Sequence, residues 1–507
     1  MEKQNTPINP ARLEKPAKPG KMPLSAVWVI STIIFCAIFT ITLIPRAQAQ
    51  SRTQDSTFQY MPIIRNVFDF IQRHYVDEVD PKVLFEGAMS GMLNSLEDPY
   101  SAFLPESEMK DLTDTTQGNF GGVGLYVSKP NAPRSDGKPN YLEVAAPIED
   151  TPGWRAGINP GDLIIQINDE TTDMLTSDEA VARLRGQPGT TVRILIRRGE
   201  RLEFPVTLTR AIIEVPTVKH AMIGNIGFLK LLTFTPMTTE RSRDAINDFR
   251  SHGYNALILD LRNNYGGLLM TAVEITNLFV EGGVVVSTKS RIAGESQIFY
   301  ARNRAMVPAE IPVIVLINRG SASASEIVAG ALKDRGRAYL VGEKSFGKGS
   351  VQQVFPLDRA GFKITTSRYF TPSDVNIDKV GIPPDREVRF PDFTETDLEA
   401  LNSLINSEKI ANYIKENPKA GRADIDSFAR SLNREYNLDT GLLQRLIRNE
   451  QNRTTIAPVY DLEYDVQLQE AVKILREENY RTLMQTSKTL KVLQEEAAQD
   501  ERFALAS

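Results

Sequence analysis

The sequence predicts a multidomain α+β protein, and three observations lead to this fold class. The chain has 507 residues, of which 41% are hydrophobic, and this is enough for several packed domains. Short segments of alternating apolar residues occur between about residues 118 and 210, as expected for β-strands. A buried-strand pattern and then a helical pattern occupy residues 256–279, and the chain is strongly helical from residue 394 onward.

The N-terminal segment is predicted to cross a membrane. The run from Leu24 to Ile44 is almost entirely apolar and about as long as a bilayer-spanning helix. Only Arg46 and Arg52 follow it closely, whereas the basic residues before it are Lys3, Arg12, Lys15, Lys18 and Lys21. Since the more basic flank stays in the cytoplasm, we expect residues 1–23 to form a cytoplasmic tail and the rest of the chain to be exported.

The sequence leaves open whether this segment is cleaved. Ala47-Gln-Ala49 resembles a signal-peptidase site. The apolar run is longer than a typical signal-peptide core, which favours an anchor formed by residues 24–45. The expected location is therefore extracytoplasmic or periplasmic, at the membrane.

Composition argues against several function classes. The single cysteine, Cys36, lies in the apolar run, so the exported part can form no disulfide. The formal net charge is −5, with no basic block outside the N-terminal tail, so nucleic-acid binding is not expected. Three scattered histidines and one cysteine argue against a transition-metal site. We predict no metal and no cofactor.

The region from about residue 118 to 210 carries strand patterns and one amphipathic helical pattern, at Ser177–Leu184. The predicted strands are Leu142–Val144, Leu163–Ile167, Val192–Ile196 and Leu202–Leu208. Together with Gly121-Gly-Val-Gly-Leu125 and Ala156-Gly-Ile-Asn-Pro-Gly-Asp-Leu-Ile164, this pattern resembles a PDZ domain.

The resemblance implies a binding site for protein C-termini. In PDZ domains, a glycine-rich loop holds a terminal carboxylate through backbone amides while the peptide adds as an extra strand. The corresponding residues here are Gly122, Val123, Gly124 and Leu125. The alternative is a glycine-rich hairpin that serves stability alone.

A strand-turn-helix segment follows. Ala256–Arg262 has the pattern of a buried strand, Asn263–Gly267 that of a tight turn, and Leu268–Phe279 that of a helix. The paired glycines Gly266 and Gly267 expose backbone N–H groups. One of these and the N–H of Ala324 at a helix start are candidates for an oxyanion hole. The alternative is an ordinary turn between a strand and a helix.

Two short segments suggest a serine nucleophile with a lysine base. They are Gly320-Ser-Ala-Ser-Ala-Ser-Glu326 and Phe346-Gly-Lys-Gly-Ser350. A lysine acts as a base only when it is neutral, which requires a dry pocket that lowers its pKa. Gly347 and Gly349 allow backbone to close around Lys348.

Other interpretations compete with a serine–lysine pair. Ser323 to Glu326 is an S-x-x-E capping box, so any serine of the run is able to start the helix predicted at Ile327–Leu332. Gly342 to Lys348 spells G-x-x-x-x-G-K, but Gly349 stands where a nucleotide-binding loop needs Ser or Thr. A catalytic histidine is not expected. His252 is the best candidate among the three histidines, and its sequence context is typical of a surface loop.

In this order, these motifs resemble the carboxy-terminal processing peptidases, or tail-specific proteases. The matching segments are Asp260-Leu-Arg-Asn-Asn-Tyr-Gly-Gly267, Gly320 to Ile327, Phe346-Gly-Lys-Gly-Ser-Val-Gln352, Thr365-Thr-Ser-Arg-Tyr-Phe-Thr-Pro-Ser373 and Gly381-Ile-Pro-Pro-Asp385. The resemblance implies Ser323 as nucleophile, Lys348 as base and Gln352 as its support. A straight strand would separate Gln352 from Lys348 by about 13 Å, so contact requires a bend. The alternative is a solvent-facing Gln352.

The resemblance also implies the domain order and a crotonase-like α/β protease core. We expect an N-terminal helical region, the PDZ domain, the core and a C-terminal helical region, at residues 55–115, 116–210, 211–392 and 393–507. Tyr100 stands where a histidine is common in the family, and Glu395 to Asn452 resembles an insertion before the terminal motif at Asp465–Ala471. Terminal helices often pair subunits in related proteins, which favours a homodimer or higher homo-oligomer. The alternative is solvated helices that pack on their own core.

Two functions of different classes follow. The first is an exported serine endopeptidase that acts on proteins with exposed C-termini. The second is a catalytically inactive PDZ scaffold that binds such tails without cutting them.

Overall fold

The computed structural model describes residues 59–129, 139–199, 201–302, 304–389, 394–453 and 458–506. The predicted cytoplasmic tail and membrane segment, residues 1–45, lie outside these ranges. Within these ranges, no helix has the length and apolar character needed to span a bilayer. The chain divides into two compact units, residues 1–92 and 93–507, which are described separately.

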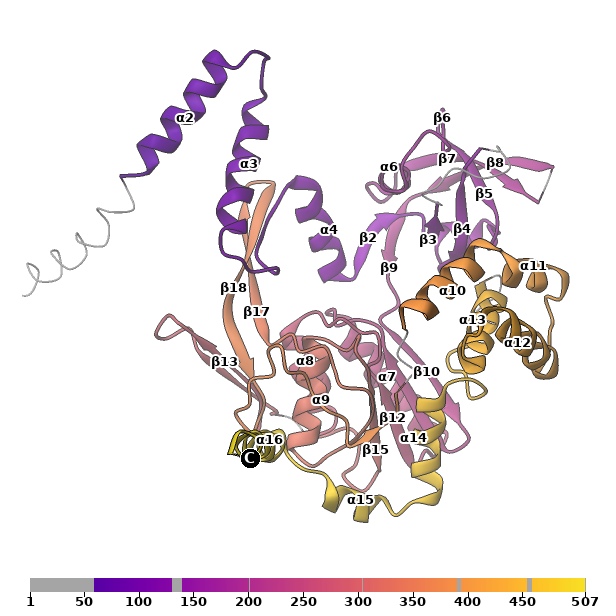
Figure 1. Ribbon diagram of the computed structural model, residues 1–507. Coiled ribbons are helices and arrows are strands. Elements are labelled where there is room, and N and C mark those ends of the chain that lie inside the picture. The colour runs from indigo at the N-terminus through magenta and orange to yellow at the C-terminus, as the bar shows by residue number, and fades with distance from the viewer. Residues whose placement is uncertain are drawn as a thin grey trace, which may run out of the picture. The chain divides into compact units, whose positions relative to one another are not determined.

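The described part of the first unit contains helix α2 (Met61–His74) and most of helix α3 (Pro81–Asn94), drawn in indigo in Figure 1. Helix α2 is amphipathic but has no buried residue; Ile63, Val67 and Phe70 are all exposed. The helical pattern expected for this region is therefore present.

The strand-rich region folds as an antiparallel sheet with one main helix. The helix is α6 (Ser177–Leu184), which begins with a capping box between Thr176 and Glu179. In spatial order, the strands are β3 (Leu125–Ser128), β4 (Leu142–Pro147), β5 (Leu163–Ile167), β7 (Thr191–Arg198) and β8 (Leu202–Thr209). Their inward side chains and those of α6 form one apolar cluster, and the predicted positions of these elements are confirmed. Strand β3 forms one edge of the sheet.

The protease-like region is built on a largely parallel sheet. In spatial order, its strands are β10 (Val218–Ile223), β11 (Ile226–Leu231), β12 (Ala256–Asp260), β15 (Val313–Ile317), β16 (Tyr339–Gly342) and β19 (Arg386–Glu387). Only the β10–β11 pair is antiparallel. Strands β12 and β15 are buried at every position, as their continuous apolar sequences predict for central parallel strands.

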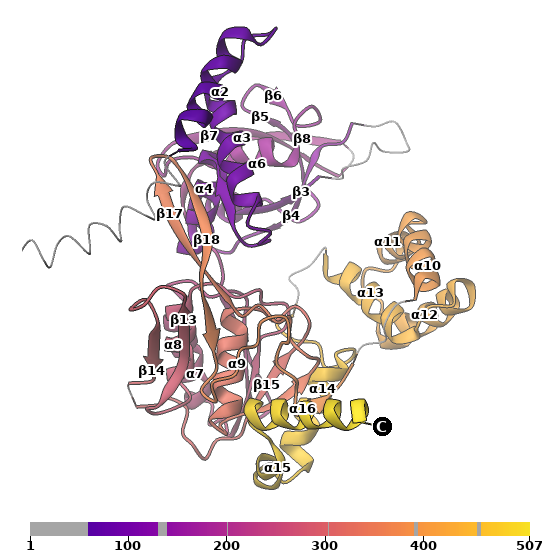
Figure 2. The same cartoon turned by 60° about the vertical axis from the view of Figure 1, so that its left-hand side comes forward.

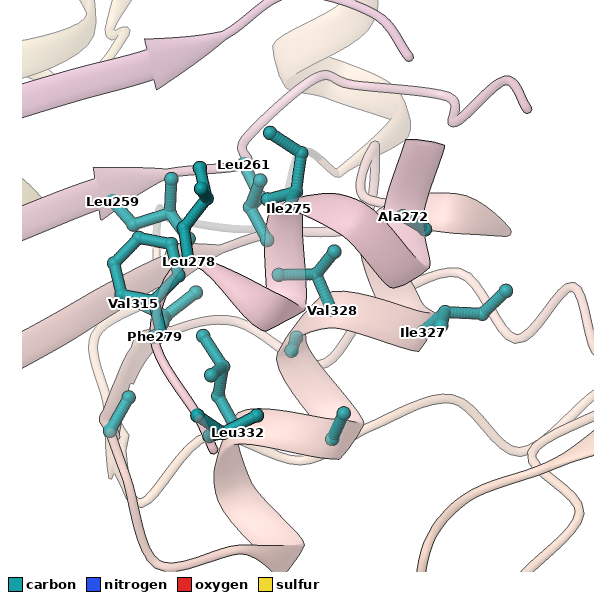
Figure 3. Close-up of a cluster of buried hydrophobic side chains, with 14 of the residues drawn as sticks. Leu259, Leu261, Ala272, Ile275, Leu278, Phe279, Val315, Ile327, Val328 and Leu332 are labelled. Carbon is teal, nitrogen blue, oxygen red and sulfur yellow. The ribbon is translucent and has the colours of Figure 1, made fainter. Parts of the chain in front are cut away.

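Helices cover both faces of this sheet. Helices α7 (Thr238–Ser251), α8 (Leu269–Asn277) and α9 (Ala324–Asp334) contribute to the large core cluster, and α14 (Val466–Glu477) belongs to a second cluster. Figure 3 shows side chains of α8 and α9, among them Ile275, Val328 and Leu332, gathered beside Leu259 and Val315 of the sheet. Ala324 to Lys333 of α9 are all buried, so packing fixes the start of this helix firmly.

A second sheet joins distant parts of the chain. In spatial order, it comprises β1 (Ala102–Leu104), β18 (Ala360–Phe370), β13 (Val284–Ser290) and β14 (Gln297–Tyr300), with β17 (Ser350–Leu357) also paired to β18. The β17–β18 hairpin is the long orange ribbon in Figures 1 and 2. Pairing of Ala102 with Lys363 brings the segment before β1 next to this hairpin. This part also contains helix α4 (Glu106–Gln117). It contains a two-stranded antiparallel sheet as well, formed by β2 (Asn119–Gly122) and β9 (Ala211–Glu214).

The expected insertion forms four separate helices. They are α10 (Glu395–Asn406), α11 (Lys409–Glu416), α12 (Arg422–Tyr436) and α13 (Thr440–Arg453). Leu404, Ile425, Leu432 and Leu443 lie in a cluster formed by this segment and Tyr464, so the insertion has an apolar core of its own. Helices α15 (Tyr480–Thr486) and α16 (Leu490–Ala506) follow α14.

Candidate active site

Ser323 occupies a strained position at the start of α9. Its backbone has φ +55° and ψ −114°, in the half of conformational space that favours glycine. Such a conformation costs about 1–3 kcal/mol and is found most often at functional sites. Ser323 stands at the N-cap of α9, where this strained backbone places its hydroxyl at the first turn of the helix.

The neighbouring serines have structural tasks. The Ser321 hydroxyl donates to the Leu261 carbonyl at 2.9 Å, and the Ser325 hydroxyl donates to the Asn264 carbonyl at 2.8 Å. Both serines are fully buried, whereas Ser323 is partly exposed. The structure therefore distinguishes Ser323, the candidate nucleophile, from the two structural serines, which the residue pattern alone could not do.

Lys348 lies in the loop between β16 and β17, with its side chain half-buried. Burial lowers the pKa of its amine, and Lys363 lowers it further, while the Asp98 and Glu326 carboxylates partly oppose the change. A larger fraction of the amine is therefore neutral near pH 7 than in a solvent-exposed lysine.

Backbone closes around Lys348, as the flanking glycines predicted. A Cβ on Gly347 would lie 2.9 Å from the nitrogen of Gly381, and one on Gly349 would lie 2.5 Å from the nitrogen of Asp378. Side chains at either position would push this loop apart.

Glu326 joins the two candidate catalytic segments through their backbone. Its carboxylate accepts hydrogen bonds from the N–H groups of Ser323 at 2.8 Å, Lys348 at 2.9 Å and Gly347 at 2.7 Å, and from the Ser345 hydroxyl at 2.6 Å. Burial raises the pKa of the Glu326 carboxyl, and these four hydrogen bonds oppose the rise. One buried group thus fixes the nucleophile and base segments next to each other.

Tyr369 makes a second connection between the same two segments. Its buried hydroxyl donates to the Lys348 carbonyl and lies 3.3 Å from the Ser323 carbonyl oxygen. Burial raises the pKa of this phenol well above its usual value, so the group stays protonated and able to donate. Among the described residues, no hydrogen bond joins the Ser323 hydroxyl to the Lys348 amine.

The glycine turn lies against the start of α9. A Cβ on Gly266 would fall 2.9 Å from both the Ala324 nitrogen and the Ser323 Cβ. The Gly266 N–H already donates to the Asn264 side chain at 2.9 Å, so it is not available as an oxyanion donor. The N–H groups of Gly267 and Ala324 have no partner within the described part of the chain. Of the two predicted glycines, Gly267 is therefore the one whose amide has no partner among the described residues.

Gln352 is not hydrogen-bonded to Lys348. A β-bulge between Val351 and Gln352 supplies the bend that contact requires. The Gln352 amide nitrogen instead donates to the hydroxyls of Ser350 at 2.9 Å and Thr365 at 3.2 Å.

The glycine-rich loop between β2 and β3 borders a pocket of about 430 Å³. Gly122 to Val127 line it together with Val181 and Leu184 of α6. The Val123 and Gly124 carbonyls accept hydrogen bonds from the N–H groups of Gly153 and Ile148, respectively. The N–H groups of Val123 and Gly124 have no partner among the described residues. The four predicted binding residues thus lie together at one pocket.

Comparison with known proteins decides the family. The chain is 39% identical over 360 residues to the carboxy-terminal-processing protease of Bartonella bacilliformis, covering 69% of this chain and 80% of the relative. It is 32% identical over 350 residues to carboxy-terminal processing protease CtpA of Bacillus subtilis, covering 69% of this chain and 72% of the relative. The chain belongs to the carboxy-terminal processing proteases. It is therefore a serine peptidase.

Family models agree with this assignment along the chain. Peptidase family S41 matches residues 225–388, a PDZ domain matches residues 143–198, and the N-terminal domain of the activating protease CtpB matches residues 41–107. A solved structure of a photosystem II D1 C-terminal processing protease is 28% identical, with a TM-score of 0.39; it covers 64% of this chain, and the chain covers 92% of it. The two family matches confirm the expected carboxy-terminal processing peptidase with a PDZ domain.

The turn at Gly266 and Gly267 is anchored by a buried ion cluster that the sequence did not predict. Arg262 donates two hydrogen bonds to Asp260 and two to Asp465, all between 2.7 and 2.9 Å. Asp260 is fully buried; its burial opposes ionisation, but Arg262 and Lys230 keep the pKa of its carboxyl below the usual value. Asp465 also caps α14 through the Leu468 N–H. The terminal motif therefore supports the turn that carries Gly267.

Other sequence candidates have ordinary surroundings. His252 is exposed at the end of α7, with its ring 2.9 Å from the Asp248 carbonyl. The segment after Lys348 continues into strand β17, not into the helix that a nucleotide-binding loop requires. The described residues contain no group of three or more side chains suited to hold a metal ion.

Proposed function

We propose that this protein is an exported endopeptidase in which Lys348 activates Ser323 and a PDZ domain recognises substrate C-termini. The observation that carries the catalytic part is the Glu326 carboxylate, which binds the N–H groups of both Ser323 and Lys348. A shared buried anchor of this kind suits two residues that must act on each other.

In the proposed mechanism, neutral Lys348 accepts the Ser323 proton as the serine oxygen attacks the scissile carbonyl. The protonated amine then donates to the leaving nitrogen. The acyl-enzyme is hydrolysed by water, which Lys348 deprotonates in the same way. Positioned proton transfer contributes about 10²–10⁴-fold to such reactions.

The N–H groups of Ala324 and Gly267 are the proposed oxyanion donors. Neither N–H has a partner in the described part of the chain, and the glycine turn contacts the start of α9. Ala324 also stands at the N-terminus of α9, where the helix dipole favours negative charge. Removing one such donor typically reduces kcat by about 10²–10³-fold.

We assign Gln352 a supporting role for Lys348. Its amide nitrogen is held by Ser350 and Thr365, which leaves its carbonyl oxygen available to accept from the protonated amine. The irregularity between Val351 and Gln352 bends the strand, as this contact requires.

The PDZ pocket is the proposed binding site for the substrate's C-terminus. Val123 and Gly124 are buried residues whose N–H groups have no partner among the described residues, and buried donors normally have one. A terminal carboxylate would satisfy them, and the peptide would extend the sheet beside its edge strand β3. Apolar side chains of the peptide would face Val181 and Leu184.

The remaining elements of the proposal come from sequence. Export and anchoring rest on residues 24–45 and their basic flank. A crotonase-like core agrees with the parallel sheet and the helices on both of its faces. Self-association remains part of the proposal.

The inactive scaffold is the competing function, and cleavage separates the two. Full-length protein in detergent is incubated with an unstructured polypeptide that ends in apolar residues. We expect cleavage by the wild type, none by Ser323→Ala, and retained cleavage by folded Ser321→Ala, which loses only a structural hydroxyl. Absence of cleavage by folded wild type would favour the scaffold, and activity of Ser323→Ala would refute the assigned nucleophile.

A further inference from the structure

The turn Asp98–Ser101 reaches the candidate active site from a distant part of the chain. It immediately precedes β1, whose residues 102–104 pair with 361–363 of β18. The Ser101 hydroxyl accepts from the Thr365 N–H at 3.1 Å, which extends this contact by one position. The turn is therefore seated on the same hairpin that begins next to Lys348.

Asp98 secures the turn. Its carboxylate accepts from the hydroxyls of Ser101 at 2.5 Å and Thr365 at 2.6 Å, and from the Tyr100 N–H at 3.1 Å. The Thr365 hydroxyl also accepts from the Gln352 amide. A continuous chain of hydrogen bonds thus runs from Gln352 through Thr365 to Asp98.

This anchoring places the ring of Tyr100 against the Lys348 amine. The amine nitrogen lies 4.7 Å from the ring centroid, within the range of a cation–π contact. Tyr100 is itself partly buried. Burial and the carboxylates of Asp378, Asp98 and Glu326 raise the pKa of its phenol, so the group remains uncharged at neutral pH.

We propose that Tyr100 is a positioning residue whose ring covers the Lys348 amine and keeps water from one side of it, with Asp98 holding the ring in place. The proposal rests on the proposed role of Lys348 as the general base. The turn Asp98–Ser101 would then affect the protonation of Lys348, although it lies far from Lys348 in the sequence.

The ring affects the amine in two opposing ways. The face of the ring attracts the ammonium form, which raises the pKa of the amine. The ring also excludes water that would solvate the ammonium, which lowers the pKa. The charged groups around the amine are Lys363, Asp98 and Glu326, and none of them is removed by a change at Tyr100. Since burial is the largest influence on this amine, loss of the ring should raise its pKa.

The first experiment compares Tyr100→Phe with Tyr100→Ala in steady-state cleavage from pH 6 to 10. The phenylalanine variant keeps the ring and should match the wild type within about twofold. The alanine variant should lose about tenfold in kcat at pH 7 with little change in KM, because each unit of higher pKa leaves about tenfold less neutral amine. Its rising limb should move up by about one pH unit.

A second experiment reads the amine without catalysis. In a Ser323→Ala background, acetic anhydride labelling of Lys348 is followed by mass spectrometry as a function of pH, with exposed Lys344 as the internal control. Tyr100→Ala should move the Lys348 midpoint to higher pH, and Tyr100→Phe should not. Thermal unfolding reports folding, and Tyr100→Val replaces the alanine variant should that protein be unfolded.

The two experiments separate the proposals. If Ser323→Ala still cleaves, the proposed mechanism fails, while the labelling still tests the ring. An unchanged Lys348 midpoint in a folded Tyr100→Ala or Tyr100→Val protein would overturn the role of Tyr100. A loss in Tyr100→Phe as large as in Tyr100→Ala would also overturn it, because the hydroxyl and not the ring would then matter.

Discussion

At the scale of single residues, the site depends on backbone groups held by two buried side chains. Glu326 binds N–H groups of the Ser323 and Lys348 segments, and Tyr369 contacts a carbonyl of each. Neither side chain needs to contact substrate. Their proposed effect is to keep the nucleophile and base at a fixed separation, which matters because small displacements of catalytic groups cost much of the rate.

Replacement of Glu326 by glutamine should damage both stability and activity. A carboxylate accepts all four present hydrogen bonds, whereas an amide turns its NH₂ group towards some of these donors. Each buried donor left unpaired costs about 1–3 kcal/mol. We expect urea denaturation to show a loss of at least about 2 kcal/mol and kcat to fall about 100-fold. Glu310→Gln, at an exposed position, is the control; equal behaviour of the two variants would refute the anchoring role.

Tyr369→Phe should show a milder effect of the same kind. It keeps the buried ring and removes one hydroxyl, so the expected loss of stability is about 1 kcal/mol. We expect kcat to fall about tenfold and KM to change little, since only the relative position of Ser323 and Lys348 is affected. A changed KM with unchanged kcat in steady-state assays would contradict this interpretation.

The sequence predicted part of this residue-scale arrangement. Glu326 was visible as the last residue of an S-x-x-E pattern, but that pattern is equally typical of a simple helix cap. The choice of Ser323 over Ser321 and Ser325 came from family resemblance, because residue spacing does not reveal which hydroxyl is already bonded. The strained backbone of Ser323, at φ +55°, likewise depends on tertiary structure, so it cannot be predicted from residue type.

At the scale of elements, local patterns predicted the strands and helices well. The predicted helix at Ser177–Leu184 and the strand at Leu163–Ile167 have the bounds found in the structure. The pairing of β1 with β18 could not be predicted, since it joins residues about 260 positions apart and neither strand has a pattern that names its partner. The same holds for the contact between Arg262 and Asp465.

The Arg262 cluster should be sensitive to a conservative change. Lysine cannot reproduce two bidentate contacts, and a poorly compensated buried carboxylate is expensive. We expect Arg262→Lys to lower the free energy of unfolding by about 3 kcal/mol. The matched control is Arg241→Lys, which alters a half-exposed pair with Glu214 and should cost less than about 1 kcal/mol. Similar losses in the two variants, measured by denaturation, would refute the importance of the cluster.

At the scale of the whole molecule, recognition and cleavage are assigned to different regions of one chain. Among the described residues, the PDZ pocket has unpaired amides that are the proposed carboxylate site, whereas Ser323 is the proposed nucleophile and lies beside two proposed oxyanion donors. Sequence patterns predicted both regions and their order. The helical insertion was predicted only as a helical stretch, since its division into four helices around their own core depends on tertiary packing.

Amidation of the substrate's C-terminus should test this division of labour. It removes the charge that the Val123 and Gly124 amides are proposed to bind, while leaving the scissile bond unchanged. We expect kcat/KM to fall about tenfold or more, mainly through KM. An unchanged rate in a direct comparison of the free acid and the amide would argue against carboxylate recognition by the PDZ pocket.

The central claim is that a partly dehydrated, neutral Lys348 activates Ser323, and the pH dependence of kcat/KM tests it most directly. The account predicts a rise with pH through a midpoint below the usual lysine value of about 10.4, with no activity in Lys348→Arg, whose guanidinium stays charged. A rate that rises only above that value, or a Lys348→Arg variant that cleaves as well as the wild type, would contradict it.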